Sequence, residues 1–87
     1  MWYVYLLVNE EDKHYIGMSN DVERRLGEHN LGKSEYTKGH KWQLVYYEAY
    51  FSKKDAIVRE KRLKQDGRAK YALMQRVEES ERMVKNI

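Results

Sequence analysis

The sequence predicts an α+β fold in which a three-stranded, mainly antiparallel sheet is flanked by helices in the order ββαβαα. Three observations support this. Residues 2–18 hold two β-rich segments around a polar turn, residues 42–50 form a third segment, and capped helical patterns follow. A sheet covered by helices lets both kinds of element bury their apolar faces. The 87 residues contain no proline, repeat or linker, and they predict a single domain over residues 1–87.

The first two predicted strands form a β-hairpin. Residues 2–8 alternate loosely between two faces, and residues 14–18 follow after a polar turn. This hairpin would bring Tyr5 and Tyr15 together on one face, although a cross-strand tyrosine pair is also ordinary sheet packing. Gly17 interrupts the second strand, and a strand glycine marks a bulge, a close approach by a ligand or simply the strand end.

Capping patterns predict where the helices begin. Asn20, followed three residues later by a glutamate, predicts the N-cap of a helix over residues 21–29. Ser52, followed three residues later by an aspartate, predicts a second helix to about residue 65, which a glycine then breaks. A third helix is predicted over residues 68–83, with apolar residues along one face.

Composition sets outer limits on the function. The formal net charge is +3, from 17 Lys and Arg against 14 Asp and Glu. This balance weakly favours anionic partners, and an ordinary solvated surface also explains it. The absence of cysteine excludes disulfides and thiolate zinc sites. No apolar run reaches the length of a membrane span and no signal peptide is visible, so the expected location is the cytoplasm.

Three residues could carry chemistry beside the tyrosines. Arg25 and His29 are four positions apart and therefore share one helix face. That face could also be a solvated surface with no functional role. Glu60 continues an apolar helical stripe, so its carboxylate needs a cationic partner. That partner could be an arginine, a metal ion, or Lys64 or Lys53 in a salt bridge. One carboxylate with waters and phosphate oxygens is an ordinary way to hold Mg²⁺.

Two further segments could contact a phosphate backbone. Tyr36 and Lys38 lie with a threonine in a glycine-flanked loop, which could grip phosphates or be a flexible surface loop. The second helix carries a basic run that could contact DNA or be its solvated side, namely Arg59, Lys61, Arg62 and Lys64.

In combination, these segments resemble the GIY-YIG nuclease domain, in particular its small stand-alone bacterial branch. The matching segments are Tyr3-Val4-Tyr5, Tyr15-Ile16-Gly17, residues 21–30, residues 36–39, residues 44–46 and the helix 56–64. The resemblance runs from residue 2 to about residue 67, and only the combination is specific. The first motif reads Tyr-Val-Tyr in place of Gly-Ile-Tyr, and the asparagine found in many members has no assigned position here.

The resemblance implies an endonuclease that hydrolyses DNA phosphodiester bonds, in DNA repair or recombination, with one divalent metal ion, Mg²⁺ or Mn²⁺. It leaves two alternatives open: a non-catalytic nucleic-acid-binding module, and a nuclease subunit that depends on a protein partner. A homodimer is a further expectation, because two copies could cut both strands. DNA and RNA are not distinguished by the sequence.

The resemblance also implies roles for individual residues. Tyr5 and Tyr15 would be the paired phenols of the active centre, one of them orienting or deprotonating the attacking water. Arg25 would contact the scissile phosphate with His29 as its helper, and Glu60 would bind the metal. Gly17 would keep the strand surface open, and Tyr36 falls where some members have another polar active-site residue. With Lys38 of the same loop, these are the predicted nucleic-acid-binding positions.

Overall fold

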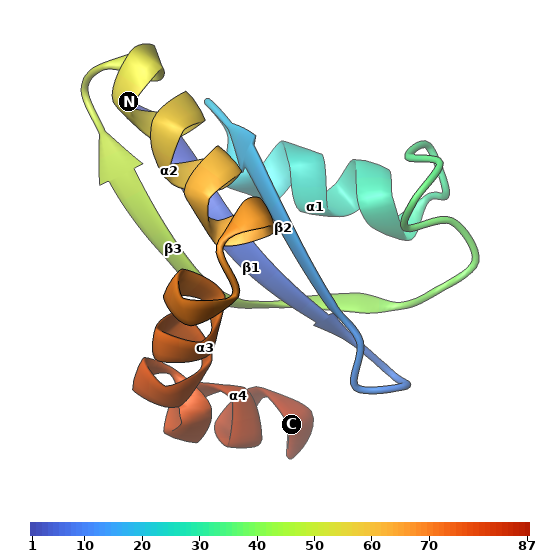
Figure 1. The fold of residues 1–87 in the computed structure, drawn as a ribbon. Helices are drawn as coiled ribbons and strands as arrows, with labels where there is room; N and C mark the ends of the chain where they lie inside the picture. The colour runs from blue at the N-terminus through green and yellow to red at the C-terminus, as the bar shows by residue number, and fades with distance from the viewer.

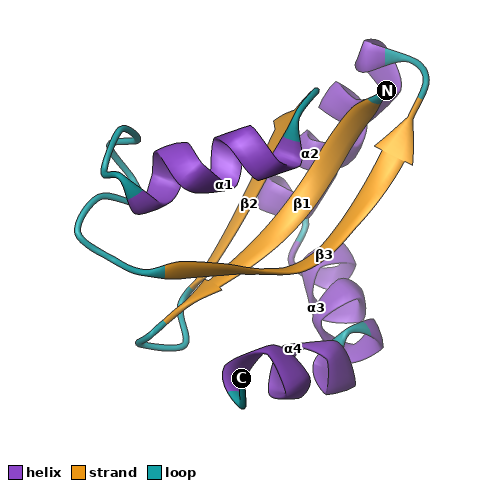
Figure 2. Cartoon of the chain, turned by 180° about the vertical axis from the view of Figure 1, so that it is seen from behind, coloured by secondary structure: helices purple, strands orange, loops and turns teal.

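The computed structural model describes residues 1–87 and confirms the predicted fold class. Three strands form one sheet in the order β2-β1-β3, with both neighbouring pairs antiparallel. The strands are β1 (Trp2–Asn9), β2 (His14–Ser19) and β3 (Trp42–Tyr50). The helices are α1 (Val22–Asn30), α2 (Lys53–Gln65), α3 (Gly67–Arg76) and α4 (Glu78–Lys85). Figure 1 shows α2 over one face of the sheet, and Figure 2 shows α1 across the opposite face.

The central strand β1 is buried on both faces because helices cover both. On one face Val4, Leu6 and Ile16 form a core with apolar side chains of α2, α3 and the residue after α3. On the other face Tyr5 and Leu7 pack with Trp42 and with the α1 stripe. Alternation along β1 therefore separates two apolar cores rather than an inner and an outer surface. The second core is the one that carries the candidate site.

The side chain of Asn9 stabilises the turn of the hairpin. Oδ1 of Asn9 accepts hydrogen bonds from the backbone N–H groups of Glu11 and Lys13, at 2.8 and 3.0 Å. Asp12 takes a φ of 62°, a left-handed conformation that aspartate tolerates better than most residues. The nitrogen of Lys85, at the end of α4, lies 2.7 Å from the Asp12 carboxylate, so the chain terminus is tied to this turn.

One predicted helix start is wrong and the other is confirmed. Asp21, not Asn20, is the N-cap of α1, and its carboxylate accepts from the backbone N–H of Arg24 at 3.0 Å. The reason is that Ser19 Oγ already accepts from the N–H of Asp21, which delays the first helical turn by one residue. Ser52 is the N-cap of α2 as predicted, and its hydroxyl accepts a hydrogen bond from the backbone N–H of Asp55 at 3.4 Å.

The C-terminal part is broken in two places. Asp66 ends α2 and caps α3, because its carboxylate accepts from the N–H of Arg68 at 2.9 Å; Gly67, the predicted breaker, already lies in α3. The helix predicted over residues 68–83 is divided at Val77, which is buried in the core. No helix of the structure combines the length and apolar character that crossing a membrane requires.

Candidate active site

A buried imidazole joins the sheet, α1 and the following loop. His29 has no exposed surface; its Nε2 lies 2.8 Å from the Tyr5 hydroxyl and its Nδ1 lies 2.7 Å from Oγ1 of Thr37. The Thr37 hydroxyl donates to the carbonyl oxygen of Ser34 at 3.4 Å. For a neutral imidazole, the Nδ1–H then donates to Thr37 and Nε2 accepts from Tyr5. The site therefore rests on one directed chain of hydrogen bonds.

The loop between α1 and β3 holds Thr37 in that chain. Gly32 adopts a φ of 77° directly after α1, a conformation that glycine reaches without steric cost. The indole N–H of Trp42 donates to the carbonyl oxygen of Thr37 at 2.8 Å. The side chain of Asn30 pairs with both backbone groups of Trp42, at 2.6 and 3.0 Å. The His-Asn pair of the helix motif is thus used for anchoring the loop as well as for the site.

Gly17 is explained by the tyrosine opposite it. Tyr5 pairs with Gly17 across the two strands, and a Cβ atom at position 17 would lie 2.4 Å from the Tyr5 hydroxyl oxygen. Real side chains do not approach so closely, so any larger residue would displace the phenol. The group that needs the glycine is therefore a side chain of the same protein, and a nucleic-acid contact at buried Gly17 remains a prediction.

Tyr15 lies at the edge of the same cluster. Its ring centroid is 4.9 Å from that of His29 and 6.5 Å from that of Tyr5. Tyr15 belongs to the edge strand β2 and is only partly buried, whereas Tyr5 is 2% exposed. The structure thus brings the two predicted tyrosines together with His29, and it leaves Tyr15 as the phenol that solvent can reach.

Arg25 stands beside these rings on α1. Its guanidinium pairs with the Glu28 carboxylate at 2.9 Å, and that contact raises the pKa of Arg25 and lowers that of Glu28. The side chain is 31% exposed, so a second partner has access to it. Predicted residues Tyr5, Tyr15, Arg25 and His29 therefore form one cluster between α1 and the hairpin.

Burial keeps both hydrogen-bonded groups of the site neutral. Loss of solvent raises the pKa of Tyr5 to about 12, and the neighbouring Tyr15 adds to the rise, which Arg25 partly offsets. Burial also lowers the pKa of His29, and the positive charge of Arg25 acts in the same direction. At neutral pH Tyr5 is therefore a phenol that donates and His29 an imidazole that accepts.

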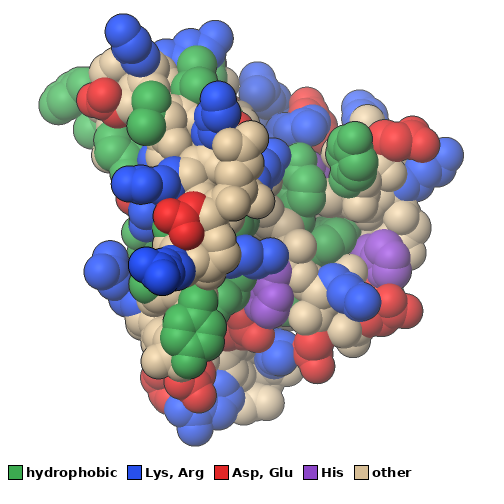
Figure 3. Space-filling model, viewed as in Figure 1, with side chains coloured by type: hydrophobic (Ala, Val, Ile, Leu, Met, Phe, Trp, Pro, Cys, Tyr) green, Lys and Arg blue, Asp and Glu red, His purple; other side chains and the backbone are tan.

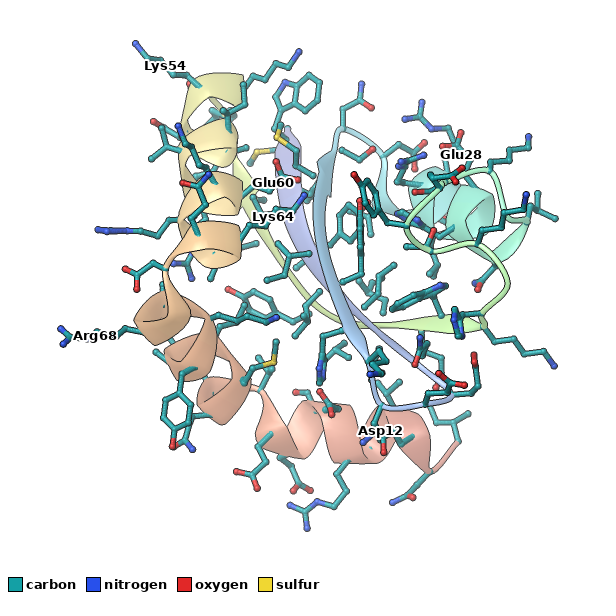
Figure 4. All side chains as sticks on the ribbon, turned by 45° about the vertical axis from the view of Figure 1, so that its right-hand side comes forward. Asp12, Glu28, Lys54, Glu60, Lys64 and Arg68 are labelled. Carbon is teal, nitrogen blue, oxygen red and sulfur yellow. The ribbon has the colours of Figure 1, made fainter.

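Glu60 approaches from α2, on the other side of β2. Figure 4 shows Glu60 and Lys64 projecting from α2 toward β2, with Glu28 of α1 beyond that strand. The Glu60 side chain is 22% exposed, and its carboxylate pairs with the Lys64 ammonium at 3.2 Å. The negative charge of Glu60 contributes to the raised pKa of Tyr5. The salt bridge to Lys64, left open by the sequence, is thus present.

The donor set at Glu60 limits which metal could bind there. Glu60 belongs to no cluster of three metal-ligating side chains, so one carboxylate would act with waters and substrate oxygens. That set fits a hard cation such as Mg²⁺ or Mn²⁺, which keeps most of its waters. It does not fit Zn²⁺, which favours nitrogen and sulfur ligands.

Several predicted contacts lie elsewhere. Tyr36 is 87% exposed and Lys38 is exposed, so both are available to a ligand, whereas the Thr37 hydroxyl between them faces the interior. Of the basic run on α2, Arg59 pairs with the Glu48 carboxylate at 2.8 Å and is not on the outer face. Figure 3 shows that Lys and Arg side chains nevertheless gather over α2 and α3, interspersed with fewer acidic ones.

The structure also shows groups that sequence reasoning missed. Thr37 is the partner of His29, whereas the sequence placed it in the loop segment 36–39 as a possible phosphate contact and did not indicate that it turns inward. Glu10, Glu11 and His40 come together beside the hairpin turn and could hold a metal ion. Glu10 and His40 are already paired at 2.7 Å, and this hydrogen bond raises the pKa of His40 and holds that of Glu10 at about 2. Only the fold brings position 40 to position 10.

Comparison with known proteins identifies the family of this chain. The sequence pattern of the GIY-YIG catalytic domain matches residues 1–72, which include β1 to α2 and most of α3. This chain belongs to the GIY-YIG family, a nuclease-type fold whose members are generally endonucleases.

Within that family it is similar to proteins called UPF0213. A UPF0213 protein of Haloquadratum walsbyi is 39% identical over 70 residues, covering 78% of this chain and 79% of the relative. One from Natronomonas pharaonis is 40% identical over 70 residues, covering 78% and 82%. The solution structure of the UPF0213 protein of Bacillus halodurans superposes with a TM-score of 0.55 at 35% identity, covering 86% of this chain and 84% of that one.

Proposed function

We propose that this chain is a metal-dependent endonuclease domain that hydrolyses phosphodiester bonds of DNA. One observation carries the proposal: the edge strand β2 has the cluster of Tyr5, Tyr15, Arg25 and His29 on one side and Glu60 on the other. Phenols, a guanidinium and a carboxylate around one strand are the groups that hydrolysis of a phosphodiester requires. A setting in DNA repair or recombination rests on the family resemblance alone.

The protein groups divide the work by their burial and charge. Arg25 offers a planar fork for two phosphate oxygens and would exchange Glu28 for the phosphate. Tyr15, at the solvent edge, orients the attacking water through its hydroxyl group. Tyr5 stays protonated and holds His29, since burial raises the pKa of Tyr5 to about 12. A divalent metal on Glu60 would supply charge neutralisation for the leaving oxygen.

Binding of the nucleic acid is proposed to involve the exposed basic residues and the loop after α1. Lys61 and Arg62 on α2, with Tyr36 and Lys38 on the loop, are all exposed. Such contacts neutralise phosphates without reading sequence, so binding should weaken steeply with salt.

The test is cleavage of branched, nicked and duplex DNA in Mg²⁺ or Mn²⁺. Wild type is expected to cut at least one substrate, and Glu60→Gln and Tyr15→Phe to slow it by about 100-fold or more. Ser80→Ala, on exposed α4, serves as a control with unchanged activity. The proposal fails for these substrates if wild type and Glu60→Gln are equally inert on all of them.

One observation favours a non-catalytic binding module as the second candidate. Glu60 is already neutralised by Lys64 at 3.2 Å, so the carboxylate is satisfied without a metal. This candidate predicts DNA binding that needs no metal and survives both Glu60→Gln and Tyr15→Phe, with no cleavage by any variant. A nuclease that acts only with a protein partner or as a homodimer would instead gain activity when the partner is added or when dimers form.

A further inference from the structure

Lys64 differs from the outward-facing basic side chains of α2 in the direction it takes. Figure 4 shows Lys64 projecting toward β2, whereas Lys54 projects away from the sheet. The Lys64 nitrogen lies 3.2 Å from Oε2 of Glu60 and 5.5 Å from the centre of the Tyr15 ring. Lys64 therefore lies beside both the carboxylate that would bind the metal and the ring of Tyr15.

This ammonium meets a need that a metal ion would also meet. The Glu60 side chain is only 22% exposed, and a partly buried carboxylate requires a compensating cation. Lys64 supplies one positive charge at Oε2, and a divalent metal would supply two at the same group. Since the two cations repel one another, they compete for Glu60 and do not share it.

We propose that Lys64 is an internal counter-ion that competes with the divalent metal for Glu60 and, once displaced, binds a phosphate of the nucleic acid. The inference rests on the proposed function, because it takes Glu60 as the metal ligand. Lysine suits both positions, since its ammonium is a point charge on a flexible four-carbon stem. The side chain is 45% exposed, so it is free to leave the carboxylate.

Competition predicts opposite effects of one substitution on two ligands. Removing the ammonium should strengthen metal binding, because Glu60 loses its competitor. The same change should weaken DNA binding in the presence of metal, because a phosphate contact is lost. A lysine that only supports the helix through an i,i+4 ion pair would alter neither equilibrium in this manner.

The first arm measures free Mn²⁺ by electron paramagnetic resonance, without nucleic acid, in wild type, Lys64→Met, Lys54→Met and Glu60→Gln. Lys64→Met should bind Mn²⁺ roughly two- to fivefold more tightly, the range expected for a partly exposed ion pair. Lys54→Met removes the same charge from the same helix and should match wild type. Glu60→Gln reports Mn²⁺ bound elsewhere, including at Glu10, Glu11 and His40.

The second arm measures binding of a phosphorothioate-linked DNA duplex, which resists cleavage, by fluorescence anisotropy over a range of salt. In Mn²⁺, Lys64→Met should reduce the slope of log K against log salt by about 0.9, the loss of one phosphate contact. In EDTA, where Lys64 remains paired with Glu60, the slopes of wild type and Lys64→Met should agree.

The results separate this inference from the proposed function. Equal Mn²⁺ affinity in wild type and Lys64→Met, with weaker binding in Glu60→Gln, overturns the competition and leaves the metal site standing. If Glu60→Gln binds Mn²⁺ as tightly as wild type, Glu60 is not the metal ligand, and the inference falls with it. A slope that falls equally in Mn²⁺ and EDTA overturns the release of Lys64 by the metal.

Discussion

The hydroxyl group of Tyr5 lies 2.8 Å from Nε2 of His29, a buried contact between side chains 24 residues apart that joins β1 to α1. Because His29 is out of solvent, its Nε2 depends on the Tyr5 hydroxyl for its hydrogen bond. Stability and the arrangement of the candidate site therefore depend on the same pair of atoms.

Replacing Tyr5 by Phe should destabilise the protein by about 1–3 kcal/mol, because Nε2 of His29 is left buried without a partner. The free energy of unfolding in urea measures this. Tyr3→Phe is the matched control on the same strand, since the Tyr3 hydroxyl has no protein hydrogen-bond partner, and it should change the free energy by less than about 0.5 kcal/mol. Equal effects of the two substitutions would contradict the role of the Tyr5–His29 bond.

Thr37→Val should cost about 1–3 kcal/mol of unfolding free energy, since it removes the acceptor of the His29 Nδ1–H. Nitrogen-15 NMR of the imidazole should show the Nδ1–H tautomer in wild type and in Thr37→Ser, which keeps the hydroxyl. Thr37→Val should lose that preference. The same tautomer population in all three proteins would rule out Thr37 as the group that orients the ring.

Gly17→Ala should destabilise the protein by about 1–3 kcal/mol, because its Cβ would overlap the Tyr5 phenol. In a Tyr5→Ala background the penalty should largely vanish, giving a coupling energy of about 1 kcal/mol or more in a double-mutant cycle. Gly27→Ala is the control: nothing lies within 4 Å of its Cβ, and alanine within α1 should stabilise by about 0.5–1 kcal/mol. Additive effects of Gly17→Ala and Tyr5→Ala would contradict the steric explanation.

The pKa values of His29 and His40 should lie on opposite sides of the ordinary value of about 6.5. The pKa of His29 is lowered by burial, and that of His40 is raised by its hydrogen bond to Glu10. Imidazole proton NMR shifts in EDTA should show His29 titrating below pH 6.5 and His40 above it. The reverse order would contradict the burial of His29 and the pairing of His40.

The two pKa shifts should make opposite contributions to the pH dependence of the unfolding free energy. His29 is held neutral, so its contribution to the unfolding free energy falls as pH drops from 6.5 toward the pKa of the folded state. His40 is held protonated, so its contribution is present below pH 6.5 and is lost as pH rises through its folded pKa. His40→Gln should therefore flatten the dependence of stability on pH above 6.5. A His40→Gln profile parallel to wild type above pH 6.5 would contradict this assignment.

Arg25→Lys should lower kcat for DNA cleavage by about 100-fold, because one ammonium does not replace a planar fork on two phosphate oxygens. Arg24→Lys is the control at the neighbouring position. The Arg24 side chain is exposed and directed to Ser19 and Glu28. Single-turnover rates in Mn²⁺ give the comparison. Equal rates in the two variants would exclude Arg25 as the phosphate ligand.

The sequence by itself determined the fold class and the members of the cluster around His29. The fold class follows from local patterns, namely the alternation in residues 2–8, the polar turn and the Ser52 cap. Each pattern depends on residues that are close in the sequence. Tyr5, Tyr15, Arg25 and His29 come from one hairpin and the helix that follows it. The family resemblance grouped them into one site, because neither the hairpin nor the helix pattern alone places Tyr5 against His29, 24 residues away.

Only the tertiary structure decided which partner each polar group takes. Thr37 turns inward to His29 because the loop is anchored by Trp42, and Lys64 turns toward β2 because Glu60 and Tyr15 are there. Likewise, Gly17 is required by the Tyr5 ring opposite it. Periodicity reports which face of an element is apolar, but the direction of a polar side chain depends on what another element places beside it.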